Sequence, residues 1–305
     1  MVLRSVWSFW TKPYRASREA SWADDWYHWL AWGLSVHAAR QHYPETVLVT
    51  DDAGARVLVD ALELPFVEVS TALNDLDADP DWWALGKLEA YRSQKAPFVH
   101  IDADVFLWTP LAPALDTAPV FAQHPEPIPS LSATCYRPDV LEAAVEPEPL
   151  PVEWAWYRKA RADWRGACCG VFGGAHTDFI QHYAAEALRL ATDARYSAGM
   201  ARLGDKSGHM ILLEQYLLSA CVEYHAQRPG SAFADVEIHY IFDCIEEAYN
   251  SGTAEAAGYT HLAGGTKRNR RICRALERRV RQDLPLFYAR CQERAHRFGA
   301  ALAET

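Results

Sequence analysis

The sequence predicts an α/β fold, in which a mostly parallel sheet is flanked by helices and followed by a helical C-terminal extension. Two patterns carry this prediction. Short apolar runs alternate with segments of helical periodicity through the first hundred residues, which is the rhythm of βαβ units. After residue 266, arginines recur every three or four residues beside an apolar face, which is typical of a surface helix. We therefore expect a main domain over residues 1–266 and a basic helical extension over residues 267–305.

Strands and helices are expected to alternate through the first hundred residues. Ser21 and Asp24 resemble a capping box ahead of tryptophans that recur on one helical face, and Pro44 ends that helix. A short helix follows Gly54. The apolar runs and their flanking turns predict strands at residues 2–10, 46–50, 66–70 and 97–101, and a helix over about residues 82–94.

The chain between Pro125 and Pro151 interrupts this alternation. Seven prolines fall within it, which predicts loops rather than a periodic core, and we interpret the stretch as an insertion or lid. Regular patterns then return. They predict a strand at residues 167–174, helices at about residues 177–191 and 207–226, and a short strand at residues 259–262.

The composition is that of a globular protein. Half of the 305 residues are hydrophobic and 23% are charged, and this length fits either two domains or one large α/β domain. The seven cysteines show no CxxC pair, so neither a disulfide framework nor a cysteine zinc site is expected. No apolar run reaches the roughly 18 residues of a membrane span, and no secretion leader is expected. We therefore expect a cytoplasmic protein.

Charge is distributed unevenly along the chain. The net charge is −10, yet the segment from Lys267 onward carries 11 Lys and Arg against four Asp and Glu, which leaves about −17 on residues 1–266. An acidic body lacks the broad positive surface that nucleic-acid binding requires, so we expect no nucleic-acid partner. The same acidity is compatible with a site for a divalent cation.

Asp102-Ala103-Asp104 follows a buried apolar strand. Side chains at alternate positions of a strand point to the same side, so the two carboxylates can converge on one cation. Hard ions such as Mg²⁺ and Mn²⁺ take one or two protein carboxylates and complete their shell with substrate phosphate and water. Ligands of open α/β sheets bind beyond the carboxyl ends of the strands, where these acids fall. The alternative is a solvated strand end.

A second motif lies near the end of the main domain, where His261 is followed by Gly264 and Lys267 in the pattern H-x-x-G-x-x-K. An imidazole can join a metal shell, glycine lets backbone approach a ligand closely, and lysine supplies a positive charge for phosphate. The alternative is a strand-end histidine followed by a plain turn.

Together the two motifs resemble the retaining, metal-dependent nucleotide-sugar glycosyltransferases of the glycogenin and bacterial lipopolysaccharide galactosyltransferase family. The resemblance implies a GT-A fold, which is a Rossmann-like α/β arrangement. It implies that Asp102, Asp104 and His261 hold Mn²⁺ or Mg²⁺ on the donor diphosphate, and that Gly264 and Lys267 contact that diphosphate.

Further stretches match this family in chain order. Lys87-Leu88 resembles its helix over the donor site, the stretch from Cys169 to Gly174 its small-residue strand beside the sugar, and Glu214-Gln215 its acid-glutamine pair. The resemblance implies that Glu214 and Gln215 position the sugar. It implies donor contacts for Lys87, Gly173 and Gly174, and we expect further donor contacts for Trp10, Thr11 and Ala103. The chain departs from the family where Arg268 replaces the usual Pro-Trp after the lysine, where Glu214 replaces aspartate, and in the first strand loop.

The resemblance implies transfer of a sugar from a nucleotide-sugar, expected to be a UDP-sugar, to an acceptor with retention of configuration. We expect acceptor contacts in the proline-rich stretch. Two alternatives remain open from the residues: a non-catalytic nucleotide-sugar or sugar binding protein of the same fold, and a metal-dependent phosphohydrolase or nucleotidyltransferase. No Walker phosphate loop occurs to favour the latter.

The basic extension has two interpretations. Five arginines form one helical stripe beside a second face of apolar residues, and Pro285 is expected to end this helix before another over residues 284–301. We favour a helix docked on the acidic body. The alternative is peripheral contact with anionic lipid at the inner membrane face. The stripe consists of Arg268, Arg271, Arg274, Arg278 and Arg281.

Overall fold

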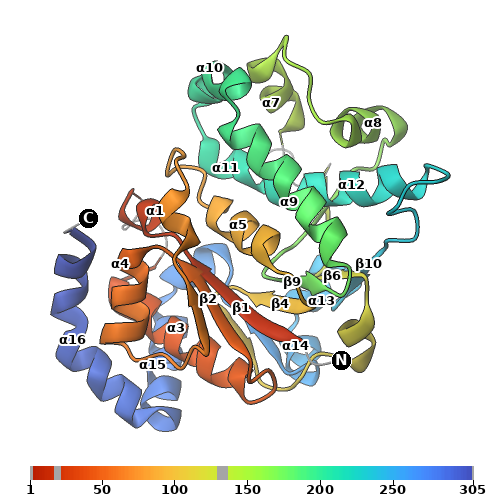
Figure 1. Cartoon of the computed structure of the whole chain (residues 1–305). Coiled ribbons are helices and arrows are strands. Elements are labelled where there is room, and N and C mark those ends of the chain that lie inside the picture. The colour runs from red at the N-terminus through yellow and green to blue at the C-terminus, as the bar shows by residue number, and fades with distance from the viewer. Residues whose placement is uncertain (1–2, 17–21, 129–136, 304–305) are drawn as a thin grey trace.

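A seven-stranded sheet lies at the centre of the computed structural model, which describes residues 3–16, 22–128 and 137–303 (Figure 1). The strand order is β10-β6-β9-β4-β1-β2-β3, and within this sheet β9 alone runs antiparallel to its neighbours. The mostly parallel sheet expected from the sequence is therefore confirmed. Its strands are β1 Arg4–Phe9, β2 Thr46–Thr50, β3 Glu68–Ser70, β4 Phe98–Ile101, β6 Val120–Ala122, β9 Val171–Gly174 and β10 Ile238–Tyr240.

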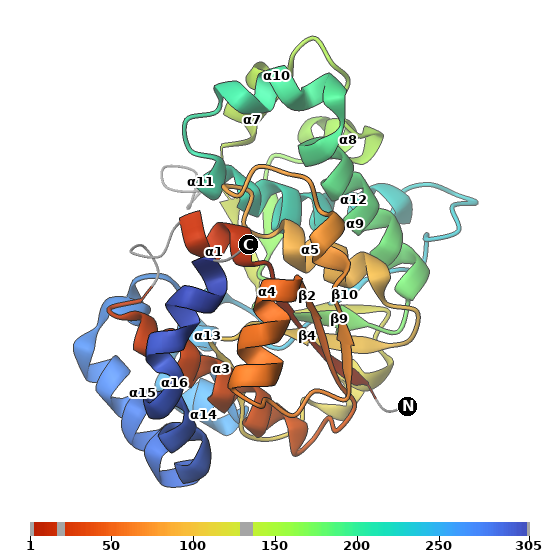
Figure 2. The ribbon, with the colours of Figure 1, turned by 60° about the vertical axis from the view of Figure 1, so that its left-hand side comes forward.

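Helices cover both faces of the sheet (Figures 1 and 2). Successive strand residues point to opposite faces, so Val6 of β1 joins the core under α5, α9 and α12, whereas Trp7 joins the core under α3. Both side chains are fully buried. Each face is therefore a separate apolar layer. The main helices are α3 Asp25–Arg40, α5 Leu85–Ser93, α9 Thr177–Thr192 and α12 Leu217–Ala226.

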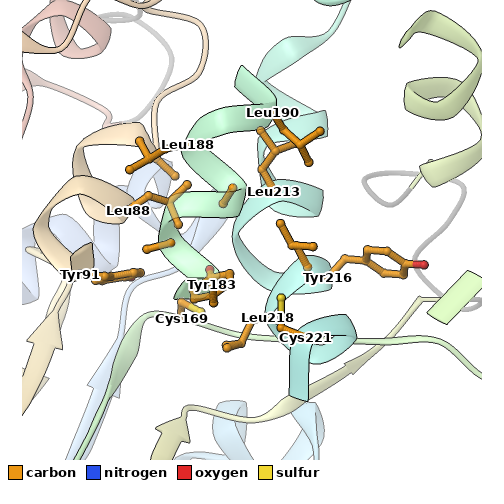
Figure 3. Packing of buried hydrophobic residues seen from close by; sticks show 14 of the residues in the cluster. Leu88, Tyr91, Cys169, Tyr183, Leu188, Leu190, Leu213, Tyr216, Leu218 and Cys221 are labelled. Atoms are coloured by element: carbon orange, nitrogen blue, oxygen red, sulfur yellow. The ribbon is translucent and has the colours of Figure 1, made fainter. Parts of the chain in front are cut away.

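The core between α5 and α9 reaches the turn that precedes α12 (Figure 3). Leu88 and Tyr91 come from α5, Tyr183 comes from α9, and all three are fully buried. The Tyr183 hydroxyl donates to the backbone oxygen of Glu214. Dense packing of this kind leaves little freedom for the backbone that it contacts, so Glu214 is held from the core side.

The described part of the proline-rich stretch combines regular elements with the predicted loops: residues 129–136 lie outside the described residues, and Pro147, Pro149 and Pro151 fall in the irregular connection between α7 and α8. Pro138 occupies the first turn of α7 (Pro138–Val145), where a missing N–H costs nothing, and Leu141 and Val145 are buried one turn apart. Pro125 pairs with Ala167 in the small ribbon of β7 and β8. Pro125, Pro127 and Pro138 therefore mark a short ribbon strand and a helix start, which the prediction of loops had missed. The ribbon strands are β7 Pro125–Pro127 and β8 Arg165–Ala167, and the helices that follow the stretch include α8 Val152–Ala160, α10 Ala194–Arg202 and α11 Lys206–Ile211.

Several boundaries differ from the sequence prediction. The side chain of Asp24 caps α3 by accepting from the N–H of Trp26, while Ser21 lies outside the described residues. The helix expected after Gly54 begins earlier, because Asp51 caps its first turn. The strand expected over residues 167–174 is divided into β8 and β9. Smaller helical elements are α1 Thr11–Ala16, α4 Asp52–Ala55, η1 Arg56–Ala61, η2 Ala72–Asp75, η3 Pro113–Thr117, η4 Leu212–Tyr216, α13 Ile245–Tyr249, α14 Ser251–Ala256 and η5 Gly264–Arg268.

A two-stranded antiparallel ribbon brings the end of the main domain back to the sheet. Its strands are β5 (Val105–Leu107), which the sequence prediction missed, and β11 (Tyr259–His261). The register pairs His261 with Val105, and the N–H of Leu262 donates to the backbone oxygen of Asp104 at 2.9 Å. This pairing sets His261 beside the carboxylates that follow β4.

The C-terminal extension packs on the main body as α15 (Arg270–Asp283) and α16 (Pro285–Ala303) (Figure 2). Cys273, Leu276 and Val280 are buried in the same core layer as α3. The five arginines of the stripe are all exposed, so the apolar side of α15 carries the packing. Among the residues that the structure describes, no helix is both long and apolar enough to cross a membrane.

Candidate functional site

A cavity of about 460 Å³ lies at the carboxyl edge of the parallel strands. Ser8 and Phe9 border it from the end of β1, the two aspartates after β4 form its floor, and Gly170 precedes β9. This is the edge at which open α/β sheets bind ligands. The ionisable residues in its wall include Asp102, Asp104, His261, Lys267, Lys87 and Glu214.

Three potential metal ligands converge in this cavity. Asp102, Asp104 and His261 each offer one ligand atom, and these atoms all lie within 4.8 Å of one another. The imidazole Nε2 of His261 is 3.6 Å from Oδ1 of Asp104. Two carboxylates and one imidazole form a mixed oxygen and nitrogen set, which Mn²⁺ accepts. The geometry therefore joins the two sequence motifs in one site.

A neighbour that is not one of the three potential metal ligands orients the ring of His261. Its Nδ1 lies 2.8 Å from Oε1 of Gln123, and since that oxygen only accepts, Nδ1 carries the proton. The Nε2 lone pair is then free for a cation. Burial, opposed by Asp104 and assisted by Lys267, lowers the pKa of His261 to about 4. At neutral pH the ring is therefore uncharged and able to act as a ligand.

Asp104 faces both a lysine and the histidine. Burial raises the pKa of Asp104, but Lys267 and His261 lower it by more, so the carboxyl stays ionised. Nζ of Lys267 lies 2.5 Å from Oδ2 of Asp104. The lysine ammonium therefore occupies one side of a carboxylate that would serve a metal.

Asp102 is held by a second lysine. Nζ of Lys87 lies 3.0 Å from Oδ1 of Asp102, 2.7 Å from Oε1 of Glu214 and 3.1 Å from the backbone oxygen of Cys169. Burial lowers the pKa of Lys87, but Asp102 and Glu214 outweigh it and raise the pKa, so the ammonium is retained. Burial raises the pKa of Asp102 to about 7, with Lys87 opposing and Asp104 adding to the shift.

Glu214 and Gln215 lie on a π-helical turn, η4, which runs directly into α12. Such turns are rare and often occur at functional sites. Glu214 is fully buried, and the hydroxyl of Tyr91 donates to its Oε1 at 3.1 Å. Its Oε2 is buried with no hydrogen-bond partner among the described residues. Both residues line the cavity, and this oxygen is a hydrogen-bond acceptor that no described group satisfies.

The model of a family described as "Family of unknown function (DUF6734)" matches residues 2–294. The chain belongs to this family. The match spans every residue that lines the cavity and the whole of α15. A search of curated proteins found no match.

The expected donor contacts divide into two groups in this DUF6734 chain. Ala103, Gly264, Lys267 and Lys87 line the cavity as expected. The other four expected residues, which lie in β1, just after it or in β9, do not. These are Trp10, Thr11, Gly173 and Gly174.

Each of those four has a structural role, and for Gly174 it is close packing, since a Cβ there would lie 2.1 Å from the backbone oxygen of Pro119. Trp10 is buried in the core under α5, and both the N–H and hydroxyl of Thr11 donate to Asp51 at the end of β2. A Cβ on Gly173 would lie 2.0 Å from the backbone oxygen of Phe98, so this glycine permits close pairing of β9 with β4. The small residue that faces the cavity is Gly170 instead.

Several lining residues were missed from the sequence. Trp22, Trp32 and Trp83 contribute aromatic surface to the cavity, and Nζ of Lys267 lies 5.9 Å from the ring centre of Trp22. The sequence favoured core packing for most N-terminal tryptophans, and only their place in the fold separates lining rings from core rings. Gln123, which orients His261 and directly follows β6, was also missed, because β6 is a three-residue strand without a periodic pattern.

A larger hollow of about 870 Å³ lies behind the ribbon of β5 and β11, between α3 and α15. It shares His261 and Tyr249 with the cavity, but Arg279 and Asp283 in its wall already form an ion pair with each other. No group of three potential metal ligands lines it among the described residues. The smaller cavity is therefore the better candidate for chemistry.

Proposed function

We propose that this DUF6734 chain is a metal-dependent glycosyltransferase of the GT-A type that moves a sugar from a UDP-sugar to an acceptor with retention of configuration. The observation that supports it best is the convergence of Asp102, Asp104 and His261 with Lys267 in one cavity at the carboxyl edge of the sheet. Glu214 borders the same cavity on the side of α12.

The residues fit a divalent cation of the Mn²⁺ class. Asp104 is ionised, His261 is neutral with its Nδ1 proton held by Gln123, and the ligand atoms lie close enough to share one ion. When bound, such an ion neutralises charge that develops on a leaving diphosphate. Asp102, Asp104 and His261 would hold it.

Other residues would bind the donor. Lys267 would exchange its contact with Asp104 for a diphosphate oxygen, and Gly264, whose φ of +53° is one that glycine adopts easily, lets backbone approach the same group. Aromatic rings such as Trp22 offer a surface for the base. Binding in this way places the sugar toward the η4 side of the cavity.

Glu214 and Gln215 would act on the sugar. The unpartnered Oε2 of Glu214 can accept from a sugar hydroxyl, and its charge stabilises positive charge that develops at the sugar carbon. Lys87 holds both Glu214 and Asp102, which couples the sugar side of the cavity to the metal side. A retaining reaction in which the leaving diphosphate takes the acceptor proton needs no protein nucleophile.

One observation also favours a binding protein without turnover. Lys87 and Lys267 pair with Asp102 and Asp104, so protein cations can balance both carboxylates. A chain of this kind would bind a nucleotide-sugar and release no nucleotide with any acceptor.

The first experiment is calorimetric titration of UDP into the purified chain with Mn²⁺, repeated with EDTA. Binding should require the metal. Asp104→Asn and His261→Ala should each weaken it by about 100-fold or more, which corresponds to about 2.7 kcal/mol. Asp235→Asn and His239→Ala, which alter residues outside the cavity, are the matched controls. Equal binding in the two cavity variants and in the controls would reject the metal site.

Turnover is then tested by release of UDP from a panel of UDP-sugars. Slow release of UDP by hydrolysis, or faster release of UDP when an acceptor is added, supports the transferase. Glu214→Gln should lose this release. Metal-dependent UDP binding without release from any sugar would leave the binding protein.

A further inference from the structure

A second group of potential metal ligands lies in the helical part of the chain, away from the cavity. Glu153 is in the first turn of α8, His182 is in α9 and His225 is in the last turn of α12. Nε2 of His182 is 3.1 Å from Oε1 of Glu153, and Nε2 of His225 is 3.7 Å from the same oxygen. The two Nε2 atoms are 3.4 Å apart.

These three distances match the separations between ligand atoms in a tetrahedral zinc site. Ligands at about 2.0–2.1 Å from a tetrahedral ion are separated from one another by roughly 3.3–3.4 Å. The observed separations of 3.1, 3.4 and 3.7 Å lie on both sides of that value. A single ion could therefore contact all three atoms with little movement of the helices.

The surroundings of His225 favour the form that binds metal, whereas His182 donates its Nε2 proton to Glu153 and a bound ion would replace that proton. Nδ1 of His225 lies 2.8 Å from Oγ of Ser231, which can accept the Nδ1 proton and leave the Nε2 lone pair on the side of Glu153. Burial lowers the pKa of His225, and the neighbouring His182 lowers it further against Glu153. Burial raises the pKa of Glu153, but the hydrogen bond from His182 and the two histidines lower it by more.

Access is open on one side. The side chain of Glu153 is only 5% exposed and that of His225 is 13% exposed, whereas that of His182 is 31% exposed. The ring of Phe233 covers the two imidazoles, at 5.4 Å and 5.2 Å between ring centres. An ion could enter past His182 and keep a water molecule as its fourth ligand.

We propose that Glu153, His182 and His225 form a site for a divalent ion of the zinc class. Two imidazoles and one carboxylate suit Zn²⁺, whereas the Asp102 cavity offers two carboxylates and one imidazole. The site is separate from the proposed transferase function and does not depend on it.

Such an ion would join three helices that are distant in the sequence. α8 directly follows the proline-rich stretch, and α12 continues from the turn that carries Glu214 and Gln215. Zinc at this position would fix α8 against α9 and α12, because a ligand that binds only the folded form stabilises it. The insertion would thereby be held in place beside the cavity.

The test uses the full chain carrying Asp104→Asn, which removes a ligand from the cavity site. Zinc chloride is added, excess is removed, and bound zinc is measured per chain together with the melting temperature. The Asp104→Asn chain should retain zinc and melt at a higher temperature with zinc than with EDTA. Adding His182→Ala should lower the zinc content by one per chain and abolish the shift. His239→Ala, an exposed histidine paired with Glu237, is the control.

A second variant and a spectrum keep the test decisive. Glu153→Gln preserves the shape of the side chain and removes its charge, and it should likewise lose zinc. Co²⁺ in the Asp104→Asn chain should give the visible absorption of a tetrahedral site, absent after His182→Ala. Zinc content unchanged by His182→Ala and Glu153→Gln, or no zinc retained by the Asp104→Asn chain, would overturn the proposal. UDP binding with Mn²⁺ should be unchanged by His182→Ala alone.

Discussion

Replacing Lys267 by methionine should change metal affinity and nucleotide affinity in opposite directions. The structure places the ammonium 2.5 Å from Oδ2 of Asp104, with the side chains 23% and 10% exposed. A cation that binds Asp104 must displace this lysine, whereas a diphosphate gains from it. Methionine retains most of the apolar stem and removes the charge, so it isolates the electrostatic contribution.

The size of the effect follows from the interaction that is lost. A charge-assisted hydrogen bond contributes about 1.5–3 kcal/mol, which corresponds to roughly 10- to 150-fold in a dissociation constant. Without its competitor, Mn²⁺ alone should bind Lys267→Met about 10-fold or more tightly than the wild type. UDP with Mn²⁺ should bind it about 10- to 100-fold more weakly.

Both constants are measured by calorimetry, first with Mn²⁺ alone and then with UDP at saturating Mn²⁺. Lys267→Arg retains the positive charge and is the matched control, and both of its constants should stay closer to those of the wild type. A Lys267→Met chain in which both affinities fall, or in which UDP affinity is unchanged, would refute the assignment of Lys267 to the diphosphate.

Three further predictions concern pH, glycine and lipid. Burial and Lys267 lower the pKa of His28 to about 3, so between pH 6.5 and 3 the unfolded chain holds a proton that the folded chain lacks. The free energy of unfolding should therefore fall by about 2 kcal/mol from pH 7 to pH 5 on account of His28. Urea unfolding at the two pH values should show this loss in the wild type and not in His28→Gln. Gly170→Ala should weaken metal-dependent UDP binding about 10-fold or more, because the added Cβ would lie 2.5 Å from both Oε1 of Gln123 and Cε1 of His261. Gly265→Ala is the control. Its Cβ would meet no described atom within 4 Å, so this variant should bind UDP normally. The docked extension should leave the chain unbound in flotation with anionic vesicles at low salt. Flotation at low salt that is lost at high salt would instead support lipid contact through the exposed arginines of α15.

Local patterns predicted most of the central fold. β2 was predicted at its observed bounds, and the helix after Asp24 and the strand that ends before Asp102 were predicted within a few residues, because caps and apolar runs are local properties. The failures were elements whose stability depends on partners. β5 and β6 have three residues each and form only through pairing with β11, and with β9 and β10. Pro138 begins α7, whose buried residues Leu141 and Val145 lie in the same core as those of α10.

The candidate site shows the same division. The sequence by itself determined that two aspartates follow a strand and that a histidine, a glycine and a lysine are spaced three residues apart, since these are statements about neighbours in the chain. Only the tertiary structure decided that His261 meets Asp104 through the β5–β11 register, and that Gln123, 138 residues away, orients its ring. It also decided that Gly170 faces the cavity while Gly173 serves strand pairing. Strand pairing and sheet order bring distant segments together through contacts that no local pattern records.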